Sequence, residues 1–122
     1  MRVWIKRLLF ALMLLLLIIQ FVHPTRINPP IDPARTIHAA LSLDPVVAST
    51  LARSCNDCHS NSTAWPWYSN VAPVSWLVAS DVGGGRNAMN FSEWRSLATE
   101  RPQKRLQETC SEVSEGEMPG KA

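Results

Sequence analysis

The sequence predicts a small all-α protein, and three observations carry this prediction. The chain has 122 residues, a length that suggests one small domain. Apolar residues recur at helical spacing along several segments, and Asp-Pro, Pro and Gly residues stand where helices would begin and end. No β-rich run is visible near residues 55–59, the most informative segment of the chain. We therefore expect a helical domain behind a separate apolar N-terminal helix.

Residues 1–22 are predicted to form a signal anchor, that is, an N-terminal transmembrane helix. Residues 8–22 are an apolar run with one polar interruption, and they follow Arg2, Lys6 and Arg7. A basic stretch ahead of an apolar run is typical of a secretory signal. The run is short for a full span of about 17–25 residues, but apolar residues before it can extend it if the nearest cations snorkel. No small-x-small cleavage site follows, so an uncleaved anchor is favoured over a cleaved peptide.

The basic flank of this helix also predicts the topology. Positive residues beside an apolar helix stay in the cytoplasm, so the rest of the chain is expected on the far side. This predicts a single-pass protein of the cell inner membrane with its domain on the periplasmic, extracytoplasmic side. The membrane is then the first expected partner, through the N-terminal helix.

Residues 23–43 are expected to be a Pro-rich linker. Four prolines remove backbone donors and fix φ, which favours an extended stretch that holds the domain off the membrane. His38 lies in this segment and is expected to be an exposed polar residue. The domain proper is predicted to comprise residues 44–122.

Four helices are predicted within the domain from their start and stop signals. Asp44 can cap the first helix and Pro45 suits its first turn, so this helix carries residues 55–59 at its C-terminal end. The glycine run at residues 83–85 is expected to end the second helix. Cys110 falls on the apolar face of the last helix and is expected to be buried there. The predicted segments are residues 44–59, 74–82, 91–99 and 102–116.

The segment Cys55-Asn56-Asp57-Cys58-His59 reads C-x-x-C-H, the attachment signature of a c-type haem. Two cysteines three apart lie on about the same side of one helical turn, so each thiol can add to one vinyl group of the same porphyrin. His59 can then place an imidazole nitrogen on the iron as proximal ligand. The motif predicts one covalently bound haem c per chain.

Three other interpretations of this motif are weaker and stay open. A thioredoxin-like dithiol would need a βαβ context. A zinc site would need four ligands, and only Cys110 remains among the cysteines outside the motif. A structural disulfide between Cys55 and Cys58 would leave His59 unexplained.

Six aromatic residues fall within residues 65–94. A haem needs a flat apolar wall, and aromatic rings provide one. Trp65, Trp67 and Trp76 are therefore candidate cofactor-binding residues. The alternative is an ordinary aromatic core. The two interpretations merge in a domain this small, because the haem would itself be the core.

Met118 is the candidate for the sixth iron ligand. It follows the stop of the last predicted helix and precedes Pro119, so a loop can swing its thioether across the far face of the haem. Met89, His38 and an iron without a protein ligand at this position are the alternatives. Met89 can equally fill core space.

Several strings of this chain match a known family together and in the same order. They are Cys55-x-x-Cys58-His59-Ser60-Asn61, Trp65-Pro66-Trp67-Tyr68-Ser69, Ala72-Pro73-Val74-Ser75-Trp76, Gly85-Arg86, Asn90-Phe91-Ser92-x-Trp94 and Gly116-Glu117-Met118-Pro119. Over roughly residues 14–119 the chain resembles the small bacterial membrane-anchored haem-binding domain family related to cytochrome c. Members of that family typically carry one N-terminal helix followed by an Asn-Pro segment, matched here by Asn28-Pro29-Pro30.

The resemblance implies a small cytochrome c-like helical domain around a covalent haem. It implies attachment through Cys55 and Cys58, iron ligation by His59, and Met118 as the sixth ligand. Family members usually continue after the Met-Pro element into a further helix. Only Gly120-Lys121-Ala122 follow it here, so this C-terminal helix is expected to be missing.

The function predicted from these features is that of a membrane-anchored mono-haem electron carrier, with redox partner proteins that the sequence does not identify. The net charge is +2, and no basic patch stands out, which argues against nucleic-acid binding. No acid/base pair or activated nucleophile is visible, so no enzymatic activity is expected. The alternatives are a haem-based sensor of small ligands with an open sixth iron position, and an anchored interaction module without a metal.

Overall fold

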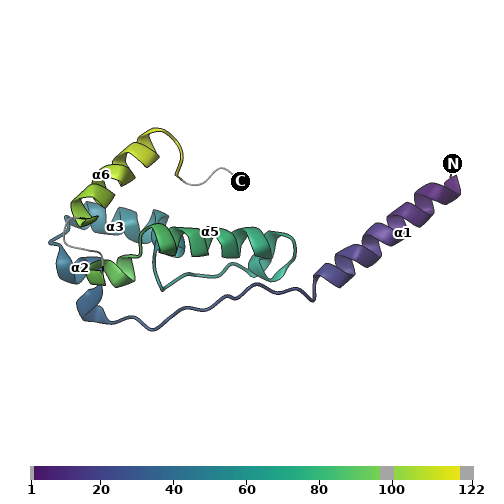
Figure 1. Ribbon diagram of the computed structural model, residues 1–122, viewed down its shortest axis with the longest axis horizontal. Coiled ribbons are helices and arrows are strands. Elements are labelled where there is room, and N and C mark those ends of the chain that lie inside the picture. Colours follow the sequence, from purple (N-terminus) through teal and green to yellow (C-terminus); the bar gives the residue numbers. More distant parts are fainter. Residues whose placement is uncertain (1, 97–100, 119–122) are drawn as a thin grey trace. The chain divides into compact units, whose positions relative to one another are not determined.

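The computed structural model describes residues 2–96 and 101–118, and this part of the chain contains helices and no strands (Figure 1). The predicted all-α class is confirmed. Elements labelled α are α-helices and those labelled η are 3-10 helices. In chain order they are α1 (Arg2–Ile19), η1 (Pro33–Arg35), α2 (Ile37–Ala40), α3 (Pro45–Ser54), α4 (Asn56–His59), η2 (Trp67–Asn70), α5 (Val74–Ala88), η3 (Phe91–Ser96) and α6 (Arg101–Ser114).

The contacts divide the chain into two units. The first unit combines Met1–Arg26 with Trp65–Ser80, and the second combines Ile27–Ala64 with Asp81–Ala122. Helix α5 contributes its first half to the first unit and its second half to the second. The whole C-x-x-C-H motif belongs to the second unit.

In the first unit, α1 is an exposed and mostly apolar helix of 18 residues. It includes Arg2, Lys6 and Arg7, which the sequence analysis treated as a flank of the apolar run. No helix in the described part of the chain is long and apolar enough to cross a membrane. The predicted transmembrane span is therefore not found among the described residues.

The residues that follow α1 are tied to the second segment of the same unit. The side-chain amide of Gln20 pairs with the backbone of Ala72, donating to its carbonyl oxygen at 3.1 Å and accepting from its N–H at 3.0 Å. The indole Nε1 of Trp76 donates to the carbonyl oxygen of Val22 at 2.9 Å. These bonds fix the start of α5 beside the C-terminal end of α1.

The second unit is built on a small buried cluster of four apolar side chains. Ile37, Met89, Phe91 and Trp94 are each at most 8% exposed. The rings of Phe91 and Trp94 lie 6.4 Å apart between centroids. Half-buried apolar residues of α2, of α3 and of the segment between them pack against this cluster.

Part of the segment expected to be an extended linker is folded into the second unit. The hydroxyl of Thr36 accepts a hydrogen bond from the N–H of Ala39 at 3.3 Å and caps α2. Ile37 packs in the buried cluster. Burial of its apolar side chain stabilises this folded segment relative to an extended one. His38 is exposed, as predicted.

Two helix ends follow the predicted chemistry. Asp44 caps α3 through its carboxylate. Gly116 has φ of 72° and ends α6 in a Schellman motif. Its N–H donates to the carbonyl oxygen of Val113 at 3.2 Å, and the N–H of Glu117 donates to that of Glu112 at 2.9 Å.

Other predicted boundaries are wrong. The first helix breaks at Cys55, where φ and ψ are −122° and −30°, so α3 and α4 are separate. Helix α5 passes through the glycine run at residues 83–85 and ends at Ala88. The third predicted helix is the 3-10 helix η3, and residues 97–99 lie outside the described part. Cys110 is exposed and not buried, because no apolar partner covers that side of α6 among the described residues.

Candidate functional site

The backbone of residues 55–59 forms one tight helical turn. The carbonyl oxygen of Cys55 accepts hydrogen bonds from the N–H groups of Cys58 at 3.2 Å and of His59 at 2.9 Å. Residues at this spacing lie on about the same side of a helical turn, as the sequence analysis assumed. Both thiols are free and half-buried. The turn therefore presents two thiols and one imidazole from five consecutive residues.

The surroundings of these thiols disfavour the thiolate. Burial raises the pKa of the Cys55 thiol. For Cys58 the pKa is raised first by burial and then by the negative charges of Asp81 and Asp57 and by Cys55. Both thiols are therefore protonated and only weakly nucleophilic at neutral pH.

The imidazole of His59 is oriented by the end of α5. Its Nδ1 lies 3.0 Å from the carbonyl oxygen of Met89. A carbonyl oxygen can only accept, so Nδ1 carries the proton and donates. The lone pair of Nε2 is then free for a metal, which is the arrangement common to ligating histidines. The ring of Phe91 lies 5.9 Å from the imidazole between centroids and helps to hold it.

Two residues of α5, Gly85 and Arg86, also contact the turn of residues 55–59 or the loop that follows it. A Cβ on Gly85 would lie 2.5 Å from the carbonyl oxygen of Cys58, closer than real Cβ atoms approach. Only glycine lets the helix backbone come this near. This contact explains why a glycine stands inside α5 rather than at its end.

Arg86 is the second of these residues, and it binds the loop that follows His59. Its Nε donates to the carbonyl oxygen of Ser60 at 2.7 Å, and its Nη2 donates to the hydroxyl of Thr63 at 2.8 Å. The same guanidinium reaches the carbonyl oxygen of Ile27 at 2.8 Å and Oδ1 of Asn28 at 2.9 Å. Burial lowers the pKa of Arg86. One side chain thus joins α5, the loop after the motif and the start of the second unit.

A closed ring of hydrogen bonds supports this loop on its other side. Nδ2 of Asn90 donates to Oδ1 of Asn61 at 2.8 Å. The N–H of Asn61 donates to the hydroxyl of Ser92 at 3.0 Å, and the N–H of Ser92 donates to Oδ1 of Asn90 at 2.9 Å. Asn61 and Ser92 are each 4% exposed. The loop is therefore held by buried and satisfied polar groups.

A cavity of about 400 Å³ opens beside His59 in the second unit. Its size is within the range of small-molecule and cofactor pockets. The structure brings His59 and Met118, the two predicted iron ligands, to the wall of this one cavity. Met89 lines it as well, whereas His38 is exposed on α2 and is not among its lining residues. The lining residues are His59, Ala88, Met89, Arg105, Glu108, Thr109, Glu112 and Met118.

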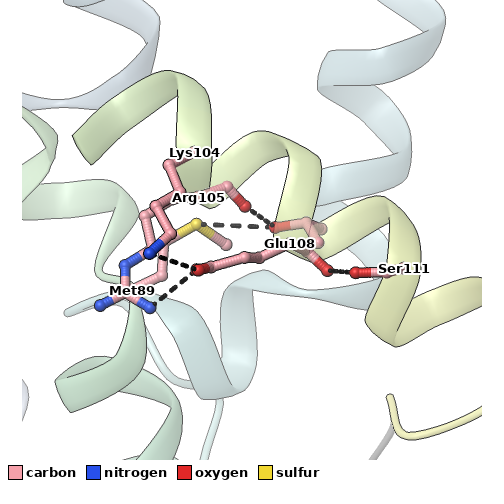
Figure 2. Close-up of polar contacts among 6 residues, drawn as sticks. Met89, Lys104, Arg105, Glu108 and Ser111 are labelled. Atoms are coloured by element: carbon pink, nitrogen blue, oxygen red, sulfur yellow. Dashed lines mark hydrogen bonds and ion pairs between the residues drawn. The ribbon is translucent and has the colours of Figure 1, made fainter. Parts of the chain in front are cut away.

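Helix α6 forms the polar wall of the cavity. Lys104 and Arg105 both approach the carboxylate of Glu108, at 3.6 Å and 3.0 Å, and the sulfur of Met89 faces the same helix (Figure 2). The hydroxyl of Thr109 lies 3.9 Å from that sulfur. This wall was not predicted from the sequence. The wall could have been predicted from the helical spacing of the polar residues 105, 108, 109 and 112, which share one face of α6.

The three tryptophans predicted to bind the cofactor belong to the first unit. Trp67 is 78% exposed and Trp76 is 37% exposed, while Trp65 is half-buried. Their contact with a haem stays a prediction. The aromatic side chains buried in the second unit are instead Phe91 and Trp94.

The model of a family described as a haem-binding domain matches residues 14–122. No curated protein and no solved structure matches the chain significantly.

The residues of the second unit fit a haem. A protonated Nδ1 leaves Nε2 of His59 free, the cavity lies beside this ring, and Met118 supplies a thioether to the same cavity. Cys55 and Cys58 lie on the same turn as His59, but neither is among the lining residues of the cavity. Among residues 2–96 and 101–118, no group of three or more His, Cys, Asp and Glu side chains is placed to hold a metal ion. A zinc site would need such a group.

Proposed function

Since this chain belongs to the haem-binding domain family, we propose that it is a mono-haem c-type cytochrome-like protein that carries one electron at a time. Haem binding follows from the family. The covalent link, the ligand set and electron transfer are the further content of the proposal. The observation that carries it is the bond between His59 Nδ1 and the Met89 carbonyl oxygen, beside a cavity that also holds Met118.

Cys55 and Cys58 would hold the cofactor covalently. Each thiol adds across one vinyl double bond, with the sulfur on one carbon and the thiol hydrogen on the other, so no leaving group or oxidant is needed. Because the free thiols are protonated at neutral pH, they stay available as S–H groups until the porphyrin is delivered. The hydrogen-bonded turn would hold the two sulfurs and the imidazole near one porphyrin ring.

His59 would ligate the iron through Nε2, and Met118 would supply its thioether as the second protein ligand. Methionine ligation raises the reduction potential relative to ligation by two histidines. When bound, the haem supplies the one-electron redox chemistry of its iron, while the protein sets ligands, burial and orientation. The buried cluster, Arg86 and the Asn61–Asn90–Ser92 ring would keep His59 in place during the redox cycle.

One observation favours a second function for the same site. Met118 follows the end of α6 and is 38% exposed, so its side chain lies at the open edge of the cavity. If its thioether does not bind the iron, a small ligand could take the sixth position. The protein would then be a haem-based sensor.

Membrane attachment is part of the proposal. The exposed apolar side chains of α1 would insert into lipid and keep the chain at the inner membrane. The haem-carrying unit would lie on the extracytoplasmic side, because Arg2, Lys6 and Arg7 favour the cytoplasmic side for the N-terminus. A reporter fused to the C-terminus should then be active only if it works in the exported compartment.

The deciding experiment concerns the thiols. The protein is made with a c-type maturation system, denatured and extracted with acidic organic solvent. Wild type and Cys110→Ala should retain their haem, and Cys55→Ala with Cys58→Ala should lose it. Haem that resists extraction equally in the double variant would refute the covalent proposal. An absorption spectrum of the wild type then separates six-coordinate low-spin iron from the five-coordinate iron of a sensor.

A further inference from the structure

Residues 67–77 form an exposed aromatic and aliphatic segment in the first unit, called here the aromatic segment. It comprises η2 and the first turn of α5. Trp67 is 78% exposed, Leu77 is 59% exposed and Tyr68 is 45% exposed. The rings of Trp67 and Tyr68 lie edge to face with centroids 5.8 Å apart. Within this unit, therefore, large apolar side chains face outward on a segment that the sequence analysis assigned to a haem wall.

The aromatic segment is fastened to the chain immediately after α1. Gln20 pairs with the backbone of Ala72, and Trp76 donates to the carbonyl oxygen of Val22, as described above. Arg26 adds a bond from its Nη1 to the carbonyl oxygen of Ser69 at 2.6 Å. Because these bonds come from residues that follow α1 closely, they hold the aromatic segment near the C-terminal end of α1.

Helix α1 presents apolar side chains on all sides. The large hydrophobic residues of α1 that precede Ile19 are between 47% and 73% exposed, so within the described chain they pack against little protein. Its N-terminal turns also carry an indole and cations, with Arg7 stacked over the ring of Trp4 at 5.8 Å. Trp and Tyr concentrate where a membrane meets water, since their rings are apolar and their N–H or O–H groups are polar.

We infer that the aromatic segment rests in the interfacial layer of a lipid bilayer, beside the C-terminal end of a membrane-embedded α1. This inference rests on the membrane attachment proposed above and names the lipid contacts that accompany it. Trp67 and Leu77 would enter the layer between headgroups and acyl chains. Trp76, whose N–H is already bound to Val22, would seat its ring there without leaving a polar group unpaired.

A lipid surface is favoured over a protein partner as the contact of the aromatic segment, because this segment is connected to α1. The segment is bonded to an apolar helix whose own side chains are exposed, so one lipid surface can cover both. It is favoured over the cofactor because Trp67 points its ring to the outside of the first unit, where it is 78% exposed. Both other occupants are outcomes of the test below.

The test uses the full haem-loaded chain in vesicles of phosphatidylcholine and phosphatidylglycerol. A photo-crosslinking benzoylphenylalanine replaces one residue at a time. Trp67 reports on the aromatic segment, Leu14 on α1, and Gln107, exposed on α6 of the other unit, is the matched control. After illumination, intact mass spectrometry measures the fraction of protein that carries a lipid adduct. We expect lipid adducts at 14 and 67, about tenfold more frequent than at 107.

Each other outcome overturns the inference in a distinguishable way. Adducts at 14 alone would place α1 in lipid and the aromatic segment outside it. Crosslinks from 67 to residues of the second unit or to the porphyrin would make it a wall of the haem site. Crosslinks from 67 to a second protein chain would make it a protein interface. Absence of adducts at 14 would refute the membrane attachment itself and leave the haem proposal untouched.

Discussion

Nδ1 of His59 lies 3.0 Å from the carbonyl oxygen of Met89, 30 residues further along the chain. This one bond fixes the imidazole tautomer, because a carbonyl can only accept. It also defines two sides of the ring. The backbone of Met89 lies on the Nδ1 side, and a metal on Nε2 would lie on the other.

The first prediction concerns the sixth iron ligand. Both methionines line the cavity, but the side chain of Met89 is 8% exposed within the buried cluster, whereas Met118 is 38% exposed and follows the end of α6. Met118→Leu should therefore abolish the weak long-wavelength band of iron–sulfur charge transfer in the oxidised protein, and Met89→Leu should keep it. Met118→Leu should also lower the reduction potential, because methionine ligation raises it. If wild type lacks the band and binds carbon monoxide at once on reduction, the sensor function replaces the electron carrier.

The second prediction tests the contact between α5 and the motif. Gly85→Ala puts a Cβ against the Cys58 carbonyl oxygen. Because the Cβ is fixed to the Cα of α5 and the oxygen belongs to the backbone of Cys58, one of the two segments must shift. We expect a loss of about 1–3 kcal/mol in the free energy of unfolding of the haem-loaded protein. Gly84→Ala is the matched control in the same helix, with no atom within 4 Å of the added Cβ. It should be neutral or stabilising by up to about 1 kcal/mol. Denaturant titration followed by circular dichroism measures both, and equal effects of the two substitutions would contradict the predicted contact.

The third prediction concerns Arg86. Arg86→Ala removes four hydrogen bonds that join three segments, and we expect it to cost about 2–4 kcal/mol of unfolding free energy. Arg86→Lys should recover only part of this, because an ammonium group cannot reproduce the planar fork of a guanidinium. Arg53→Ala, at an exposed position of α3, serves as control and should change stability by less than about 0.5 kcal/mol. Full rescue by lysine would show that charge alone, and not the hydrogen-bond geometry, is what matters.

The fourth prediction concerns removal of the haem. The buried apolar cluster of the second unit has four members, and a cavity of about 400 Å³ lies beside it. Cores of this size supply only about 3–5 kcal/mol without a further constraint. The haem-free double variant Cys55→Ala with Cys58→Ala should therefore lack a cooperative thermal transition in near-ultraviolet circular dichroism. Haem-loaded wild type, the reference, should show one. A haem-free transition close to that of the reference would mean that the helices hold the second unit together unaided.

The sequence by itself determined the features that depend on neighbouring residues. The spacing of Cys55, Cys58 and His59 places their side chains on one helical turn wherever that turn lies. The cap at Asp44 and the stop at Gly116 act through bonds that span at most five positions. Such local interactions can be predicted from the order of residues, and they predict the all-α class.

Only the tertiary structure decided the features that depend on distant residues. The glycine run continues α5 because Gly85 meets Cys58, 27 positions earlier, and no local rule contains that contact. The hydrogen bond to the Met89 carbonyl oxygen orients His59. Met118 lines the same cavity as His59 because the chain changes direction at Gly116, after the end of α6. Ile37, inside a proline-rich stretch, is buried by residues 50 and more positions away, while Cys110 has apolar spacing and stays exposed. Burial and hydrogen-bond partners are properties of the folded surface, and they are set only when segments far apart in the chain pack together.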